Sequence, residues 1–387
     1  MQDAVVIVGS GLAGHSLARE LRKLDAGVPI TLVCADAGEI YAKPTLSVAF
    51  AQAKLPDAIP HMTADAFSRQ FGVTMRTQTR VRAIDTEARC VATDAGEIAY
   101  GRLVLATGAQ QIPLPLLSPG PHTYSVNSLQ DYRALRSQLH APQRVLVVGA
   151  GFIGCEFGND LLHAGHTVDI LDLAPHALAR FWPSPLAKVF EQRMADAGVR
   201  WRLGRRLTEA HVGSFGVHAV LDTGQAIEAD IVLTALGLAP SLALAREAGL
   251  RTGRGIAVNE FLETSTQGVY AIGDCAEIQG QVLPFVTPIM HSARVLAKTL
   301  SGVATAVAFP PMPVVLKTAA CPAVFIPAAP GAQGEWDVSG DTAVLRGPDQ
   351  SPLGVALLGA AVARRDTWLK ELVAASSKQQ SPYSSLT

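Results

Sequence analysis

The sequence predicts an α/β fold that contains two similar parallel-sheet units and a small C-terminal α+β domain. Two segments of the chain match each other: "AVVIVGSGLAGHSLARELRKL" begins at Ala4, and "RVLVVGAGFIGCEFGNDLLHAG" begins at Arg144. Each predicts a β-branched strand, a glycine-rich turn and a helix, and a second strand follows each of them. The length of 387 residues is too great for one ordinary core and predicts two or three domains.

The first segment places Gly9, Gly11 and Gly14 in the spacing G-x-G-x-x-G between strand and helix. The first glycine permits a tight turn, the second lets the backbone approach a pyrophosphate, and the third lets helix and strand pack closely. The acid that binds the ribose is expected about 20 residues further on. Ala35 stands where an acid is common, and Asp36 follows it, so Asp36 is the candidate.

The second segment repeats this spacing with Gly149, Gly151 and Gly154, and Asp172 ends its following strand. A carboxylate at this place accepts hydrogen bonds from ribose hydroxyls and repels a 2′-phosphate. No arginine stands at 171–175, so the sequence predicts NAD rather than NADP. The alternative for Asp172 is a solvated acid at a strand end. Two such turns in one chain are a strong signal of dinucleotide binding.

Three further motifs, "LATGA", "TALGLAPS" and "VYAIGDCA", follow predicted strands. Together with the two turns, they resemble the two-dinucleotide flavin oxidoreductases, which have the glutathione-reductase-like fold. The resemblance implies that the first unit binds FAD, the second binds NADH, and Asp274 holds the ribityl chain. It implies the following additional contacts: Val81, Thr107, Gly108, Thr287 and Lys317 with FAD, and Gly237 with NAD.

Thr287 and Pro288 predict the start of a helix, with a hydroxyl N-cap and then proline at the first helical position. The resemblance implies that this helix points its N-terminus at the flavin, where it would stabilise negative charge. The alternative is an ordinary helix cap.

Glu156 lies one turn into the second helix. The resemblance implies that this residue lies near the nicotinamide and pairs with a lysine that ends an "LSK" pattern. Val48 occupies that position here, so Lys43 in "YAKP" is the expected replacement and a candidate contact of FAD. A cation there would offset charge on the flavin. The alternative for Lys43 is a solvated loop lysine.

The five cysteines show no CxxC spacing, and none lies between Tyr41 and Phe50. This predicts buried free thiols in a reducing, cytoplasmic compartment, with neither a disulfide framework nor a metal site. Electrons would therefore leave the flavin directly for an external acceptor.

"YAKPTLS" and "PMPVVLKTAACPAVF" are similar to segments of bacterial rubredoxin–NAD⁺ reductases, and the similarity runs over nearly the whole chain. The resemblance implies that electrons pass from NADH through FAD to the iron carrier rubredoxin, with Lys317 close to the flavin. A lysine on a solvated strand face is the alternative. Glu156, Lys43 and Lys317 are thus the candidate catalytic residues.

Other functions stay open. An NADH-dependent reductase of ferredoxin or flavorubredoxin shares the absence of a cysteine pair, and an NADH oxidase or a non-catalytic NADH-sensing flavoprotein are less favoured. The net charge of −1 gives no reason to expect nucleic acid as a partner. No apolar run reaches about 18 residues, so no membrane span is predicted. We expect a monomer or a weak homodimer.

Proline-rich stretches and two short predicted β-meanders suggest the domain boundaries. The expected division is an FAD-binding domain at 1–110 and 241–308, an NAD-binding domain at 111–240, a C-terminal domain at 309–375 and a disordered tail at 376–387.

Overall fold

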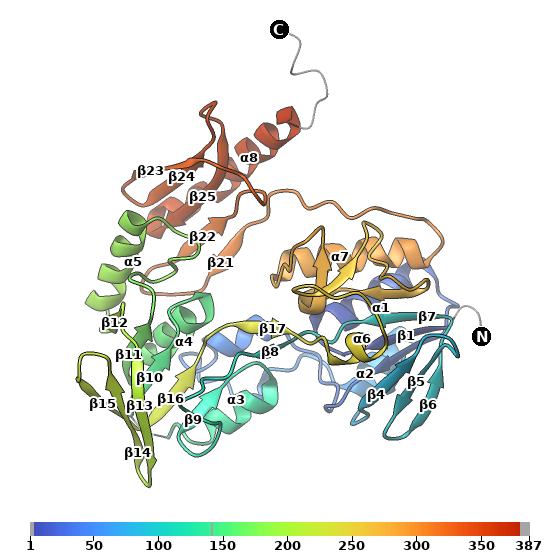
Figure 1. Cartoon of the computed structure of the whole chain (residues 1–387), viewed down its shortest axis with the longest axis horizontal. Coiled ribbons are helices and arrows are strands. Elements are labelled where there is room, and N and C mark those ends of the chain that lie inside the picture. The colour runs from blue at the N-terminus through green and yellow to red at the C-terminus, as the bar shows by residue number, and fades with distance from the viewer. Residues whose placement is uncertain (1–3, 141, 380–387) are drawn as a thin grey trace. The chain divides into compact units, whose positions relative to one another are not determined.

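A computed structural model describes residues 4–140 and 142–379 of the chain. The chain divides into two compact units (Figure 1). The first unit contains Met1–Lys43, Asp57–Gln110 and Leu238–Phe309, and the second contains Pro44–Pro56, Gln111–Gly237 and Pro310–Thr387. The short segment Pro44–Pro56 therefore groups with the second unit, although the chain on either side of it belongs to the first. The three-part division expected from the sequence stays a prediction.

The first unit is built on a five-stranded parallel sheet with the strand order β19-β7-β1-β2-β3. Every residue of the central strand is buried, which explains its continuous run of β-branched residues. The strands are β1 (Val5–Val8), β2 (Ile30–Val33), β3 (Thr74–Arg76), β7 (Arg102–Leu105) and β19 (Val269–Ala271). The helices of this unit are α1 (Leu12–Leu24), α2 (Ala64–Phe71), α6 (Ala243–Glu247) and α7 (Val286–Leu300).

Shorter strands complete the first unit. The predicted meander is confirmed as an antiparallel sheet of β4 (Val81–Asp85), β5 (Cys90–Thr93) and β6 (Gly96–Ala99). The strands β18 (Ile256–Val258) and β20 (Ala276–Ile278) form a separate pair. Where the chain passes between the units, β8 (Ala109–Gln111) pairs with β17 (Leu238–Pro240).

The second unit repeats the parallel sheet, in the order β12-β11-β10-β16-β9. Its strands are β9 (Thr123–Ser125), β10 (Arg144–Val148), β11 (Thr167–Asp172), β12 (Arg200–Leu203) and β16 (Ile231–Thr234). Its helices are α3 (Leu129–Arg136), α4 (Phe152–His163) and α5 (Ser184–Asp196). The second meander, predicted from His218 onward, begins earlier than expected, as an antiparallel sheet of β13 (Leu207–Gly213), β14 (Gly216–Leu221) and β15 (Ala226–Ala229).

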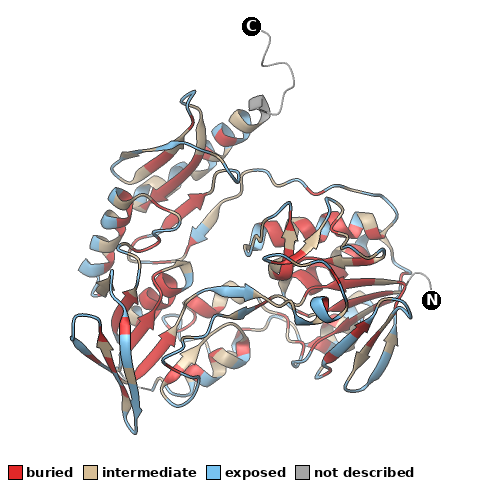
Figure 2. Cartoon of the chain, viewed as in Figure 1, coloured by how far each residue is buried: buried red, intermediate tan, exposed pale blue. Residues whose placement is uncertain are grey.

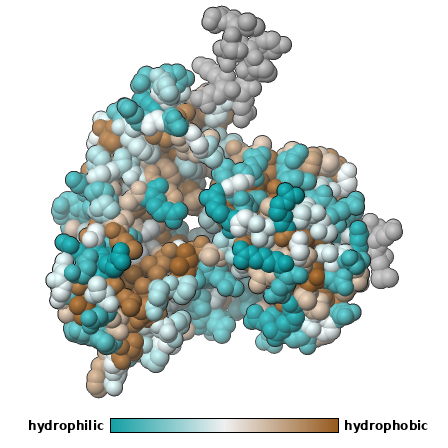
Figure 3. Space-filling view, in the orientation of Figure 1, coloured by the Kyte–Doolittle hydropathy of each residue, from teal (hydrophilic) through white to brown (hydrophobic). Residues whose placement is uncertain are grey.

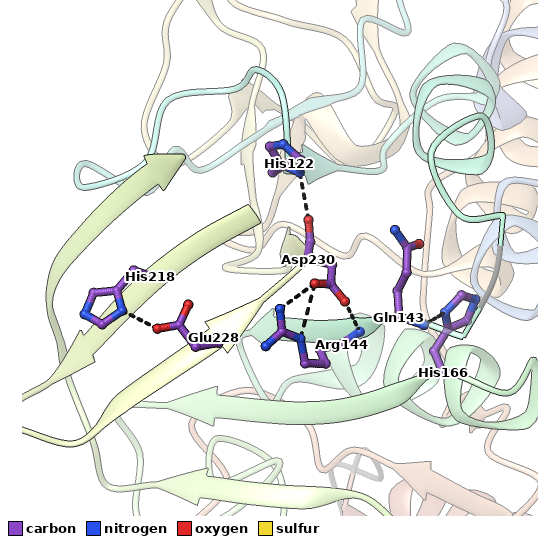
Figure 4. Close-up of polar contacts among 7 residues, drawn as sticks. All are labelled: His122, Gln143, Arg144, His166, His218, Glu228 and Asp230. Atoms are coloured by element: carbon purple, nitrogen blue, oxygen red, sulfur yellow. Dashed lines mark hydrogen bonds and ion pairs between the residues drawn. The ribbon is translucent and has the colours of Figure 1, made fainter. Parts of the chain in front are cut away.

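Polar contacts fix the amino-terminal edge of this sheet, where β10 begins (Figure 4). The Nη2 of Arg144 donates to Asp230 at 2.6 Å, and the backbone N–H of Arg144 donates to the same carboxylate at 2.7 Å. This guanidinium lowers the pKa of Asp230, which directly precedes β16. The backbone N–H of Gln143 donates to Nδ1 of His166 at 3.2 Å. These contacts hold the amino-terminal ends of the strands and do not involve the carboxyl ends, where the glycine turn lies.

The C-terminal residues form an antiparallel sheet in the order β21-β22-β25-β24-β23. Its strands are β21 (Val314–Leu316), β22 (Ala323–Ile326), β23 (Glu335–Ser339), β24 (Thr342–Arg346) and β25 (Pro352–Leu358). Trp368 and Leu372 of helix α8 (Arg365–Gln379) pack on its buried face, drawn red in Figure 2. The sequence predicted this antiparallel sheet with its helix but missed β23, in which exposed and half-buried residues alternate.

Three sequence predictions need correction. The run Gly354–Ala363 was expected to be one strand, but β25 ends at Leu358 and Gly359–Arg364 form a 3₁₀ helix. Helix α8 extends to Gln379, so the first four residues of the expected disordered tail are helical, and residues 380–387 lie outside the described part. Helix α7 begins at Val286 with Phe285 as its N-cap, so Thr287 is not the cap. Proline fits anywhere in the first turn, where N–H groups lack intrahelical acceptors, so Pro288 does not fix the first residue. The helices within residues 4–140 and 142–379 are too short or too polar to span a bilayer.

Candidate functional site

The first glycine turn lies at the carboxyl end of β1. Gly9 has φ +114°, and a Cβ on it would stand 2.2 Å from the carbonyl oxygen of Ala106. A Cβ on Gly14 would stand 1.9 Å from the carbonyl oxygen of Gly9. Gly11 has open space in front of it and begins α1 without a side-chain cap. Gly9 and Gly14 are thus required by close packing, while Gly11 leaves room for a ligand at the helix N-terminus.

Asp36 lies beside this turn. Its Oδ1 accepts from the hydroxyl of Ser10 at 3.4 Å and from the backbone N–H of Gly38 at 2.9 Å. The structure therefore places Asp36 within reach of the glycine turn, while Ala35 offers no polar side chain. Its role as the ribose acid stays a prediction.

Asp274 lies in a short 3₁₀ helix after β19, another strand that ends at this edge of the sheet. A Cβ on the preceding Gly273 would stand 2.8 Å from Cβ of Ala13 in the first turn of α1. Burial raises the pKa of Asp274, although the positive charge of Lys43 opposes this effect. The Oδ1 atom of Asp274 is buried and accepts no hydrogen bond from any described residue. A buried carboxylate oxygen without a protein donor leaves an acceptor for a ligand hydroxyl, a water or an ion.

This first cradle fits a flavin dinucleotide. Open space at Gly11 suits a pyrophosphate, and the unpartnered oxygen of Asp274 suits a ligand hydroxyl. Thr107 and Gly108 follow β7 at the same edge: the Thr107 hydroxyl donates to Ser241 O at 3.3 Å, and Gly108 has φ +66° with open space in front of it.

The other predicted FAD contacts differ in exposure. Val81 is buried at the start of β4, whereas Thr287 is exposed in the first turn of α7. No contact in the structure decides their assignment.

The second glycine turn repeats the geometry of the first in the second unit. Gly149 has φ +115°, and a Cβ on it would stand 2.4 Å from the carbonyl oxygen of Ala235. A Cβ on Gly154 would stand 1.8 Å from Gly149 O, and Gly151 again faces open space. Gly237, with φ +98°, accepts from the backbone N–H of Ile112 at 3.1 Å, where the chain leaves this unit.

Asp172 at the end of β11 bonds directly to this turn. Its Oδ2 accepts from the N–H of Ala150 at 2.6 Å, and its Oδ1 accepts from the N–H of Ala174 at 2.8 Å. The residue is half-buried, so the carboxylate both orders the turn and remains accessible. Ile153, which follows the glycine turn, and Leu173, which follows Asp172, are exposed hydrophobic residues. Figure 3 shows apolar surface on this unit.

A charged cluster lies on α4, the helix that begins at the second turn. Glu156 is buried, and its Oε2 is 2.7 Å from Nζ of Lys317. The ammonium also donates to Pro44 O at 2.7 Å and to Oγ of Ser47 at 3.2 Å, so all three of its hydrogens have acceptors. Ser47 also donates to Glu156, whose Oε1 accepts from the backbone N–H of Lys317 at 3.0 Å. The cluster fixes one cation on one buried carboxylate.

This cluster corrects the expected partner of Glu156. The sequence assigned the partner role to Lys43, but Lys317 forms the ion pair. Lys317 lies 161 residues from Glu156 in the chain, directly after β21, so spacing could not reveal the pair. Lys43 belongs to the first unit, where its charge acts on Asp274.

Three functional candidates on these elements were missed: Ser47, Asn159 and Asp160. The last two follow Glu156 by three and four residues, so all three α4 residues share one helix face. Buried polar residues at this spacing were the available signal.

The described cysteines are all free. Four of them are buried, as predicted, whereas Cys90 is only half-buried; the buried ones are Cys34, Cys155, Cys275 and Cys321. Burial raises the pKa of each of these thiols, that of Cys34 to about 12. A protonated buried thiol is a poor nucleophile, so these residues are packing groups.

Two glycine turns of this kind, one beside an acid with a buried and unpartnered oxygen, define a dinucleotide-dependent flavoprotein oxidoreductase. The chain belongs to the pyridine nucleotide-disulphide oxidoreductase family, which it matches over residues 3–297. Residues 306–372 match the rubredoxin binding C-terminal domain. The predicted family and the predicted fold class are confirmed.

Two relatives that match most of this chain are named as NAD(+)-linked reductases. The chain is 42% identical to rubredoxin-NAD(+) reductase of Alcanivorax borkumensis, covering 96% of this chain and 98% of that protein. It is 42% identical to nitric oxide reductase FlRd-NAD(+) reductase of Escherichia coli, covering 83% of this chain and 85% of that protein. Among solved structures, putidaredoxin reductase in its covalent complex with putidaredoxin has a TM-score of 0.88 and 27% identity, covering 97% of this chain and 99% of that one.

Proposed function

We propose that this chain is an FAD-dependent rubredoxin–NAD⁺ reductase, which takes two electrons from NADH and delivers them singly to rubredoxin. One observation carries the proposal. Lys317 lies in the region that matches the rubredoxin binding domain, and it forms an ion pair with Glu156 on the helix of the second glycine turn. The carrier-binding region and the nucleotide-binding turn are therefore joined through charged groups.

The first unit would hold FAD through Gly11 at the start of α1 and through the free oxygen of Asp274. Bound flavin supplies chemistry that accepts two electrons together and releases them one at a time. The second unit would hold NADH, with Gly151 leaving room for the pyrophosphate and Asp172 accepting from the ribose. Asp172 also disfavours the 2′-phosphate of NADPH.

Lys317 would act as a fixed positive charge. Its ammonium is held by three acceptors and needs no rearrangement when negative charge develops nearby, which is the arrangement that lowers a barrier most. Glu156 fixes this charge. Lys43, which belongs to the first unit, remains a second candidate cation for the flavin.

Electrons would leave for the carrier without a thiol relay, because the buried cysteines are held protonated. A small, weak interface with rubredoxin suits the rapid turnover of an electron carrier. Free thiols also suit a reducing compartment, so we place the protein in the cytoplasm as a monomer or weak homodimer.

The test is anaerobic reduction of rubredoxin by NADH, followed as bleaching of the rubredoxin absorbance. Parallel reactions replace rubredoxin with a [2Fe–2S] ferredoxin, or NADH with NADPH. We expect rapid bleaching with NADH and rubredoxin and slow reaction in both controls. A bound flavin that NADH reduces, without transfer to rubredoxin, would refute the acceptor.

A second candidate is a reductase of flavorubredoxin or ferredoxin. The similarity to the Escherichia coli FlRd-NAD(+) reductase favours the flavorubredoxin alternative, since its identity to this chain is also 42%. Faster reduction of the rubredoxin domain of a flavorubredoxin, or of ferredoxin, would select it. Fast oxygen uptake would indicate an NADH oxidase, and negligible turnover with every carrier would indicate an NADH-sensing flavoprotein.

A further inference from the structure

The segment Pro44–Pro56 is anchored to α4 by one buried carboxylate. The backbone N–H of Phe50 donates to Oδ2 of Asp160 at 2.8 Å, and the N–H of Ala51 donates to Oδ1 at 3.0 Å. Asp160 is 2% exposed. Two N–H donors thus converge on two oxygens of a single side chain that water hardly reaches.

The carboxyl-terminal part of the same segment has a second anchor. The hydroxyl of Tyr132 donates to Lys54 O at 3.0 Å. The ring of Phe50 lies 4.9 Å from the Tyr132 ring, and the guanidinium of Arg136 lies 5.2 Å from the Phe50 ring centre. The anchoring at Asp160 is therefore part of a packed contact rather than an isolated bond.

The amino-terminal part of this segment supplies two acceptors to Lys317. Pro44 O and Ser47 Oγ take two of the three ammonium hydrogens, and Glu156 takes the third. The Ser47 hydroxyl oxygen also lies 3.3 Å from Pro44 O. The position of the ammonium therefore depends on where this segment lies.

Glu156 and Asp160 are one helical turn apart on the same face of α4. One carboxylate binds the ammonium directly, and the other holds the segment that supplies the remaining acceptors. Between them, Asn159 accepts from the N–H of Ala320 at 3.1 Å, which fixes the chain just beyond Lys317. One helix face thus contacts Lys317 itself, the segment that supplies its other acceptors and the chain just beyond it.

We propose that Asp160 is a positioning residue for Lys317: by holding the Phe50 and Ala51 N–H groups, it fixes the segment whose acceptors place the ammonium. The chemistry requires a carboxylate. An asparagine offers one acceptor oxygen and turns an NH₂ group toward the second N–H donor, so one backbone donor would be left unsatisfied in a buried place. This inference rests on the proposed function only in its consequence for flavin reduction.

The test compares the FAD-loaded wild type, Asp160→Asn, Asp160→Glu and the control Asp169→Asn at about pH 8, because burial raises the pKa of Asp160 to about 6. Asp169 is also buried in the second unit, but its ion-pair partners are Arg200 and Arg202 of β12 rather than residues of Pro44–Pro56. Two readouts are independent of activity: hydrogen exchange of the Phe50 and Ala51 amides, and the acylation rate of Lys317 relative to the exposed Lys188.

We expect Asp160→Asn to speed both exchange and Lys317 acylation by about tenfold or more, which corresponds to one lost charge-assisted bond. Flavin reduction at saturating NADH should slow by a similar factor with KM for NADH nearly unchanged, and Asp160→Glu should recover part of the loss. Asp169→Asn should alter none of these.

Unchanged exchange in Asp160→Asn would show that the anchor is absent. Faster exchange with unchanged Lys317 acylation would reduce Asp160 to a structural residue. Faster acylation with an unchanged rate of flavin reduction would retain the positioning but refute its catalytic consequence. Wild-type enzyme that fails to reduce rubredoxin would count against the proposed function and leave the exchange and acylation results to decide the inference.

Discussion

Replacing Lys317 with methionine tests the energetic role of the charged cluster directly. The change keeps most of the side-chain volume and removes the ammonium, with its bonds to Glu156, Ser47 and Pro44. It leaves a carboxylate on Glu156 whose side chain is only 4% exposed. An unpaired buried charge is the main cause of instability when one partner of such a pair is removed.

The size of the loss follows from what remains around Glu156. Removing one partner of a buried pair costs about 3–5 kcal/mol. Two donors stay in place, because the Ser47 hydroxyl and the backbone N–H of residue 317 do not depend on the lysine side chain. The Lys317 side chain is also 32% exposed, so water screens part of the interaction. We therefore expect the lower end, about 3 kcal/mol at neutral pH.

The assay is urea unfolding followed by tryptophan fluorescence. All four tryptophans lie in the second unit, so their emission reports the unit that contains the cluster. They are Trp182, Trp201, Trp336 and Trp368. With a urea slope of about 3 kcal/mol per molar, the midpoint should fall by about 1 M.

Two comparisons make the prediction refutable. Lys188→Met removes an exposed lysine of α5 and should leave the midpoint unchanged. The double variant Glu156→Gln with Lys317→Met should regain much of the lost stability, because no charge is left unpaired. A midpoint for Lys317→Met equal to that of Lys188→Met, or a double variant no more stable than Lys317→Met, would refute the reasoning.

Four further outcomes are expected. Gly149→Ala should destabilise the second unit by more than about 1 kcal/mol, since φ is +115° and the new Cβ meets a backbone oxygen. Gly151→Ala, where the Cβ meets open space, should leave urea unfolding unchanged and weaken NADH binding in titrations. Asp274→Asn should raise the melting temperature of flavin-free protein and speed flavin loss on ultrafiltration, because the buried Oδ1 of the carboxylate has no described donor. Asp172→Ala should lower the ratio of kcat/KM for NADH over NADPH by about tenfold. Burial lowers the pKa of His15 from 6.5 to about 4. The folded first unit should therefore lose up to about 3 kcal/mol of stability relative to the unfolded chain as the pH falls from 6.5 towards 4. In His15→Leu, the urea midpoint measured by flavin absorbance should vary less over that pH range.

Local sequence was sufficient to predict the two glycine-turn units. Strand, turn and helix are adjacent in the chain there, and the glycines at positions 9 and 149 have backbone angles that other residues rarely adopt. The meanders were predictable for the same reason, because their strands alternate and are joined by short turns. The fold class therefore followed from short-range chemistry.

The charged cluster could not be predicted in this way. Its members come from Pro44–Pro56, α4 and the residues after β21, which only tertiary packing brings together. The sequence did show a lysine at both candidate positions, 43 and 317, but spacing could not decide which one reaches Glu156. Helix starts were similarly uncertain, since a proline is tolerated throughout the first turn of α7.

The two cradles show why the candidate ribose acid was harder to choose in the first unit than in the second. Val33 pairs with Val8 as Leu171 pairs with Val148, so the residue equivalent to Asp172 in the first unit is Cys34. Burial raises the pKa of this thiol to about 12, which makes it a packing group, and the acid of the first unit stands two residues later. The same strand–turn–helix arrangement therefore has its candidate acid at a different position in each unit. The distance from the glycines to the candidate acid therefore differs between the units, because β11 carries Asp172 as its last residue while β2 has already ended at Val33.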